Sequence, residues 1–272
     1  MSSTPFDYLH HLVVVPVTAN GSLESRFVLD SGIGLTIVSE ALGEAIGAEP
    51  AGSSFTGRRM SGQEVTVPLA AAPSLSLGGL VREEVEVGVL DLSGFPPELQ
   101  EIGGFVSLAF FGETPFTVDY PNRVVTLETP ETLAGRAEAG EAVDVRVERD
   151  GPSMTVFLPL TLPGGRSIEV EVDMGSDALI LDEELAAEVG VRLDGPEVRR
   201  VEGTDETGHA YVRSFTRLSG AIHPGGAPAL THADPDVMFQ RLMYEGLVGD
   251  SFLRRFAVTY DLARERLIFG RA

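Results

Sequence analysis

Two aspartates, Asp30 and Asp173, are the residues of this chain best placed to do chemistry. Each follows an apolar stretch and precedes a glycine turn, Asp30 in Asp-Ser-Gly and Asp173 in Asp-Met-Gly. A carboxyl group in this setting can cap a turn, border a phosphate-binding loop or act as a catalytic acid. Two carboxyls that fold into contact share a proton, because both cannot ionise cheaply. One can then act as a general base while the other acts as a general acid.

The two aspartates occupy matched positions of an internal repeat. The segment VPVTANGSLESRFVLDSGIGLTIVSEALGEAIG aligns without a gap with LPLTLPGGRSIEVEVDMGSDALILDEELAAEVG, and matched residues are 143 positions apart. The identical pairs include Pro16 and Pro159, Gly21 and Gly164, Asp30 and Asp173, Gly32 and Gly175, Ile37 and Ile180, Leu42 and Leu185, and Gly47 and Gly190. We expect two similar lobes to pack about a pseudo-two-fold axis, which would bring the two aspartate loops face to face.

The repeat continues further along the chain with a one-residue shift. GFVSLAFFGETPFTVDY matches GLVGDSFLRRFAVTYDL, so that Val106 pairs with Val248 and Asp119 with Asp261 at a separation of 142 positions. We interpret Asp119 and Asp261 as capping residues of turns or strands. Met238 and Met243 precede the closing strand on a short amphipathic segment and are expected to pack in the core.

Local signals in each copy predict strands and one short helix. Asn20-Gly21 is typical of a hairpin turn, and Ser39 and Asp182 stand where helix N-caps are expected, before EALGEAIG and EELAAEVG. Further hairpins are expected around Ser61-Gly62 and Thr207-Gly208. We predict an all-β fold of two similar lobes, each with one short helix. The expected ranges are 1–128 for the N-terminal lobe, 129–142 for a polar linker and 143–272 for the C-terminal lobe.

This pattern resembles the retropepsin-like aspartic proteases, and the duplicated single chain is similar in plan to the pepsin-like enzymes. The resemblance covers roughly residues 11–128 and 150–270. It implies that Asp30 and Asp173 form a catalytic dyad and that Gly32 and Gly175 shape the two loops. It also implies that a β-hairpin flap, with Ser61 and Gly62 at its tip, closes over an extended peptide. A similar role for Thr207 and Gly208 is a weaker expectation, because they lie outside the constant register.

The sequence departs from the family pattern at one position in each lobe. Met174 stands where the family has Thr or Ser, whose hydroxyl braces the opposite loop; Ser31 can make such a bond and a thioether cannot. Ser107 stands where the second lobe has Gly249, and we expect its side chain to crowd the Asp30 loop. The alternative to a protease is therefore a catalytically degenerate, peptide-binding module of the same fold.

Composition excludes several other kinds of function. The net charge is −21, and all 20 basic residues are arginines, so we expect no nucleic-acid or membrane partner. The absence of cysteine excludes disulfides, thiolate catalysis and cysteine–zinc sites. The first residues do not resemble a signal peptide, so we expect a cytoplasmic protein. Because one chain carries both aspartates, we expect a monomer that acts on a peptide or protein substrate without a cofactor or metal.

Other chemistries find less support in the residues. A dinucleotide-binding loop lacks its third glycine, since Ile37 stands at that position. A serine nucleophile lacks a partnered histidine: the five histidines are His10, His11, His209, His223 and His232, none at a repeated position and none in an H-E-x-x-H motif. A glycosidase ranks last, because the chain has no tryptophan and 7% aromatic residues.

Overall fold

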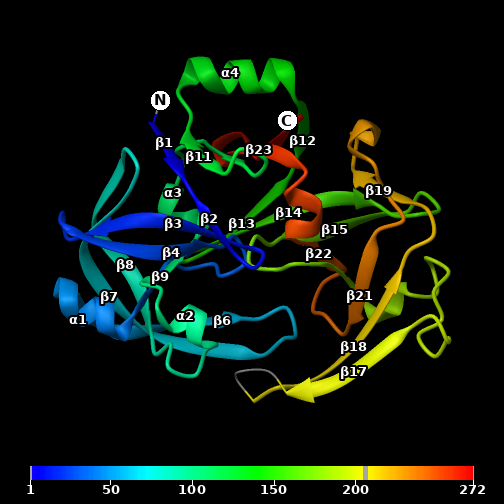
Figure 1. Cartoon of the computed structure of the whole chain (residues 1–272), viewed down its shortest axis with the longest axis horizontal. Helices are drawn as coiled ribbons and strands as arrows, with labels where there is room; N and C mark the ends of the chain where they lie inside the picture. Colours follow the sequence, from blue (N-terminus) through cyan, green and yellow to red (C-terminus); the bar gives the residue numbers. More distant parts are fainter. Residues whose placement is uncertain (1, 205–207, 272) are drawn as a thin grey trace.

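The computed structural model describes residues 2–204 and 208–271, and these residues form the expected two-lobed, mainly β architecture. Figure 1 shows the N-terminal half, coloured blue to green, on one side and the C-terminal half, coloured yellow to orange, on the other, with helix α4 (Pro130–Ala139) above both. Among the described residues, no helix is both long enough and apolar enough to cross a membrane.

The N-terminal lobe is an eight-stranded sheet. In spatial order its strands are β2 (Asp7–Leu9), β3 (Leu12–Ala19), β4 (Leu23–Leu29), β9 (Gly104–Val106), β5 (Ile37–Ser39), β8 (Leu80–Leu90), β7 (Glu64–Leu77) and β6 (Glu49–Arg58). Strand β4 runs parallel to β9, and β5 pairs antiparallel with β9 and parallel with β8. This pairing places the end of β4, and with it Asp30, in the middle of the sheet.

The C-terminal lobe repeats this pairing in a ten-stranded sheet. Its order is β17 (Arg199–Thr204), β18 (Ala210–Arg217), β21 (Asp236–Gln240), β16 (Leu179–Asp182), β22 (Gly246–Val248), β15 (Ser167–Val172), β14 (Ser153–Thr161), β19 (Ala221–Pro224) and β20 (His232–Ala233), with β13 (Arg146–Asp150) beside β14. Strand β15 runs parallel to β22, while β16 pairs antiparallel with β22 and parallel with β21. Asp173 therefore follows a strand whose neighbours correspond to those of β4.

A six-stranded sheet joins the two halves. Its order is β1 (Ser2–Pro5), β11 (Val124–Leu127), β10 (Phe116–Asp119), β23 (Phe256–Asp261), β24 (Arg266–Arg271) and β12 (Glu141–Asp144). The rings of Phe111 and Phe116 stack with centroids 3.7 Å apart, and Phe116 stacks on Tyr260 at 4.8 Å. All three rings are fully buried, and each buried aromatic side chain contributes about 1.5–3 kcal/mol. The lobes are thus joined by a continuous core as well as by strand pairing.

The helices differ from the prediction of one per lobe. The first lobe has the expected α1 (Glu40–Ile46), with Ser39 as N-cap and Gly47 in a left-handed conformation. Its counterpart is only a 3₁₀ turn (Glu183–Leu185), in which the N–H of Ala186 donates to the carbonyl of Glu183. Short helices also occur at α2 (Pro97–Gln100), α3 (Leu108–Phe111) and α5 (Asp250–Leu253), with 3₁₀ turns at Pro228–Leu230 and Leu262–Arg264.

The predicted linker 129–142 contains helix α4 rather than only irregular chain. Thr129 is its N-cap, Thr132 completes a capping box and Pro130 occupies the first turn, where its missing N–H costs nothing. The linker was predicted from the polar composition of this segment, although the segment also contains these three signals for the start of a helix. The boundaries of the two lobes remain a prediction.

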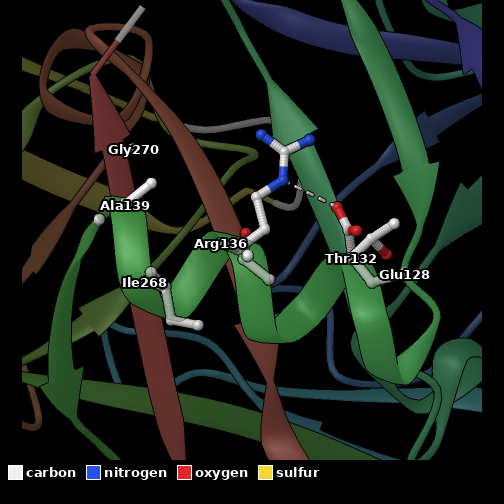
Figure 2. A pocket seen from close by; sticks show the side chains of 9 residues that line it. Glu128, Thr132, Arg136, Ala139, Ile268 and Gly270 are labelled. Atoms are coloured by element: carbon white, nitrogen blue, oxygen red, sulfur yellow. Dashed lines mark hydrogen bonds and ion pairs between the residues drawn. The ribbon is translucent and has the colours of Figure 1, made fainter.

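Helix α4 covers a cavity of about 380 Å³ above the joining sheet (Figure 2). Nε of Arg136 donates to Oε1 of Glu128 at 3.1 Å, and the Thr117 hydroxyl donates to the same oxygen at 2.5 Å. These contacts fix α4 to the sheet. None of the predicted site residues lines this cavity.

Candidate active site

Each predicted catalytic aspartate is held at the centre of its lobe by backbone hydrogen bonds. The N–H of Asp30 donates to the carbonyl of Val106 at 2.9 Å, and the N–H of Asp173 donates to the carbonyl of Val248 at 3.0 Å. After each aspartate the chain folds back, and the N–H of the following glycine, Gly32 or Gly175, donates to Oδ1 of its own aspartate at 2.8 Å. The two loops have the same local hydrogen bonding.

The two loops face each other across the lobe boundary. A Cβ placed on Gly32 would lie 2.5 Å from Oδ1 of Asp173, and one on Gly175 would lie 2.6 Å from Oδ2 of Asp30. Such contacts are far shorter than van der Waals distance, so only glycine fits at either position. The structure therefore brings together four of the predicted site residues, and each glycine makes room for the opposite carboxyl.

The proximity of the carboxyls changes their acidity. Burial raises the pKa of Asp30, and the charge of Asp173 and a hydrogen bond between the two carboxyls raise it further. Burial also raises the pKa of Asp173, and the charge of Glu171 adds to this, while the hydrogen bond from Asp30 opposes it. Raised pKa values in two adjoining carboxyls allow the pair to hold one proton, a state in which one acid and one base are available together.

Ser31 braces the second loop from the first. Its buried hydroxyl donates to the carbonyl of Val172 at 2.5 Å and accepts from the N–H of Met174 at 2.9 Å. Met174 returns no such bond: its side chain is 1% exposed and belongs to the main hydrophobic core. The bracing between the loops is therefore one-sided at these matched positions.

His11 supplies a second contact from the first lobe to the second loop. Its Nε2 lies 3.1 Å from the carbonyl oxygen of Gly175. The first loop is instead approached through Gly34, whose carbonyl accepts from the N–H of Met154 at 3.4 Å. His11 was not predicted as a site residue, because its contact joins positions 164 residues apart and follows no motif or repeat.

The expected crowding by Ser107 is not what the structure shows. The Ser107 hydroxyl lies 3.1 Å from that of Thr36, which also accepts from the Ser107 N–H at 3.3 Å. At the matched position a Cβ on Gly249 would lie 2.3 Å from the carbonyl oxygen of Ser176, so a side chain is impossible there. The first lobe accommodates Ser107 by pairing its hydroxyl with Thr36.

The flap hairpin, formed by β6, β7 and the turn 59–63, reaches the opposite lobe. Gly62 has φ +84° in this turn, and its N–H donates to the carbonyl of Arg59 at 2.8 Å. The N–H of Met243 donates to the carbonyl of Met60 at 2.9 Å, and a Cβ on Gly62 would touch Met243 at 3.3 Å. Ser61 and Gly62 therefore lie at a hairpin tip that is bonded to the second lobe.

This position of Met243 overturns its predicted place in the core. Its side chain is 51% exposed and lies against the flap tip, whereas Met238 is buried beside Ile180 and Leu247 as expected. The second predicted hairpin consists of β17 and β18. Thr207 lies outside the described residues, and a Cβ on Gly208 would meet no atom within 4 Å, so Gly208 does not rest on the other lobe as Gly62 does.

A third carboxyl, Glu171, adjoins the dyad and was missed in the sequence. It is 7% exposed, and its Oε2 accepts a hydrogen bond from the hydroxyl of Tyr244. Burial raises its pKa to about 7, and the charge of Asp30 contributes to this shift. The signal in the repeat is that Glu171 places a carboxyl at the position matched by the apolar Val28.

The other acidic pair makes structural contacts. Asp119 accepts from the N–H and Nδ2 of Asn122 at 3.1 and 2.9 Å, and buried Asp261 accepts from Nε of Arg266 at 2.8 Å. Both act as structural anchors near strand ends. Within residues 2–204 and 208–271, no group of three or more His, Asp or Glu side chains has a geometry that could hold a metal ion.

Comparison with known proteins gives the class of this fold. Residues 15–104 match the family described as aspartyl protease. The whole chain is similar to an aspartic proteinase from Irpex lacteus in its crystal structure, with a TM-score of 0.56 and 12% identity over 99% of this chain and 97% of that one. No curated protein matches the sequence. The chain has the two-lobed fold of an aspartic proteinase, and together the two matches support an aspartic protease-like family.

Proposed function

We propose that this protein is an aspartic endopeptidase that hydrolyses peptide bonds with water activated between Asp30 and Asp173. The observation that carries the proposal is the reciprocal fit of the two loops, in which each glycine faces the opposite carboxyl. The family match and the fold support a protease-like function. The half-buried position of both carboxyls where the loops meet, and the raised pKa of each, support a proton shared between them near neutral pH.

The chemistry follows from the unequal state of the two acids. The ionised Asp173 removes a proton from water, whose oxygen attacks the carbonyl carbon of the scissile bond. The protonated Asp30 donates to the carbonyl oxygen, which becomes a hydroxyl of a tetrahedral intermediate. As the intermediate collapses, Asp173 gives the proton it took from water to the amine nitrogen, which leaves as the C–N bond breaks. Asp30 takes back a proton from one hydroxyl of the intermediate, so that the product is a carboxylic acid and both aspartates return to their initial states. No covalent enzyme intermediate is required.

The Asp173 loop is supported even though Met174 stands where a residue with a bracing hydroxyl is expected. Ser31 holds the backbone on both sides of Asp173, at Val172 and Met174, and His11 contacts Gly175 next to them. The side-chain bonds that support the second loop across the lobe boundary therefore come from the first lobe. This arrangement favours an active enzyme over the alternative of a degenerate peptide-binding module.

The test is the cleavage of a peptide library by the wild type and by Asp30→Asn and Asp173→Asn. Each substitution removes an acid or base and keeps the shape of the side chain, so turnover is expected to fall by about 10²- to 10⁴-fold. The control is Asp194→Asn, which makes the same change in a carboxylate that is 88% exposed. Unchanged turnover in either dyad variant would refute the dyad.

A peptide containing statine, which mimics the tetrahedral intermediate, separates the enzyme from the binding module. An enzyme binds it far more tightly than the same peptide without the hydroxyl, because the site is complementary to the transition state. Equal affinity for the two peptides, together with no turnover of the library, would favour the module.

A further inference from the structure

The two lobes present different side chains beside their aspartates. Val28 and Glu171 each lie two residues before the aspartate, on the same face of the strand because side chains alternate along it. Val28 is fully buried in an apolar cluster with Leu35, Ile37 and Phe105. Glu171 puts a carboxyl at the corresponding place in the second lobe. Substrate on the two sides of the dyad would therefore meet unlike surfaces.

Glu171 lies near the end of the strand that leads to Asp173. It is two residues before Asp173 in β15, and it is paired in register with Leu247 of β22. Its hydrogen-bond partner Tyr244 packs with Met60 of the flap turn against one small cluster, Ile180, Met238 and Leu247. The Glu171–Tyr244 pair thus lies on the second-lobe side of the dyad, toward the flap.

Few protein groups hydrogen-bond to the carboxylate of Glu171. Among the described residues, Tyr244 is its one hydrogen-bond partner, and no arginine pairs with it. A carboxylate needs several donors, or a cation, to offset the loss of water on burial. The side chains around it do not supply them, so a cationic group of the substrate would complete the site.

The surroundings of Tyr244 are also acidic. A cavity of about 470 Å³ adjoins Tyr244 and Met243, which contacts the flap tip. Its charged lining residues are Asp182, Glu183, Glu184, Glu188, Glu245, Arg166 and Arg241. Arg166 is neutralised by ion pairs with Glu188 and Glu245. Five carboxylates against two arginines, in a chain of net charge −21, give this side of the site a field that attracts cations.

We infer that Glu171, oriented by Tyr244, forms a subsite that selects a lysine or arginine side chain next to the scissile bond of the peptide. This inference rests on the proposed function and names its substrate class. The ammonium or guanidinium group would donate to the carboxylate of Glu171, while the rest of the side chain packs against Tyr244. Glu171 acts here in specificity and takes no proton from the reaction.

The first experiment compares two peptides that differ only in lysine or norleucine at a residue flanking the cleaved bond. The wild type is expected to cleave the lysine peptide with a kcat/KM about 10- to 100-fold higher, as for a buried charge pair. Glu171→Gln and Glu171→Val, which copies the residue found at position 28, are expected to abolish or reverse this preference. Because removal of the Glu171 charge also changes the pKa of Asp173, each variant is judged by the ratio of its kcat/KM values for the two peptides.

The matched control is Glu169→Gln, on the same strand and face but 51% exposed at its side chain and paired with Arg146. It is expected to retain the preference for lysine. A wild type that prefers norleucine, or a preference for lysine that survives in Glu171→Val, would overturn the inference. The isosteric Glu171→Gln keeps the test informative if the valine variant fails to fold.

Binding separates a failure of the subsite from a failure of the proposed function. Two statine peptides, one with lysine and one with norleucine beside the statine, are titrated into wild type and Glu171→Gln by calorimetry. A preference for lysine that is lost in the variant supports the subsite even if no peptide is cleaved. Equal affinity of the wild type for both peptides overturns it, whether or not cleavage occurs.

Discussion

The Asp30 loop and the Asp173 loop have the same backbone arrangement but are supported by different side chains. Both place an aspartate after a central strand and a glycine against the opposite carboxyl. The Asp30 loop carries Ser31, which bonds across to the other lobe, whereas the Asp173 loop carries a buried methionine and receives bonds from Ser31 and His11. Glycine is needed in both loops, because a Cβ would lie too close to the opposite carboxyl. A bracing hydroxyl, in contrast, is present in the Asp30 loop only.

The largest difference in stability between substitutions at matched positions of the two lobes is expected at Gly249 and Ser107. In Gly249→Ser, the new Cβ would lie 2.3 Å from a backbone oxygen of Ser176 and force the Asp173 loop to move, at a cost of about 3 kcal/mol. Ser107→Gly, the reverse change in the first lobe, loses a hydrogen bond with Thr36 and should cost about 1 kcal/mol. Urea denaturation of both variants measures the two costs. Equal losses of stability in the two variants would contradict the conclusion that a side chain fits at position 107 but not at position 249.

Ser31→Ala is expected to affect the second loop more than its own. The buried N–H of Met174 and carbonyl of Val172 would each lose a partner, so the variant should be about 2 kcal/mol less stable and less active. Ser31→Thr keeps the hydroxyl and should restore most of both properties. The control is Ser53→Ala, which removes an exposed hydroxyl from β6. An alanine variant with wild-type stability and turnover would show that the one-sided brace is dispensable.

The repeated parts of the molecule could be predicted from the sequence, because identical residues at a constant spacing report a shared backbone. Gly32 and Gly175 are such residues, and the structure shows the contact that requires each. Ser31 could also be recognised as a brace, since a hydroxyl in this loop can reach the opposite backbone. The predicted fold class is confirmed by the likeness of the whole chain to an aspartic proteinase.

The parts that differ between the lobes could not be predicted in the same way. Glu171 was overlooked because it breaks the repeat, and His11 because its partner Gly175 lies in the other lobe. The sequence around Met243 predicts a core residue, whereas its side chain is exposed and lies against the flap tip, which belongs to the other lobe. Helix α4 lies between the two aligned copies, outside the repeat. Long-range packing, which leaves no local pattern, decides each of these features.

The smallest expected effect is a pH-dependent gain of stability when one carboxyl of the dyad is removed. Both aspartates have a folded-state pKa raised by burial and by neighbouring charge, so above pH 4 the folded state binds more protons than the unfolded chain. The contribution of these raised pKa values to the free energy of unfolding is therefore lost as pH rises above about 4, the ordinary pKa of aspartate. Asn has no such penalty, so Asp30→Asn and Asp173→Asn should each exceed the wild type by about 1 kcal/mol at pH 7.

This gain should vanish near pH 3, where the carboxyls are protonated in both states. Urea denaturation at pH 3 and pH 7 checks the sign, with Asp194→Asn as the exposed control. A variant that is less stable than the wild type at pH 7 would mean that the ionised carboxyl is stabilised in the fold. The two loops would then hold separate, fully charged acids, and the contrast between an acid at Asp30 and a base at Asp173 would fail with them.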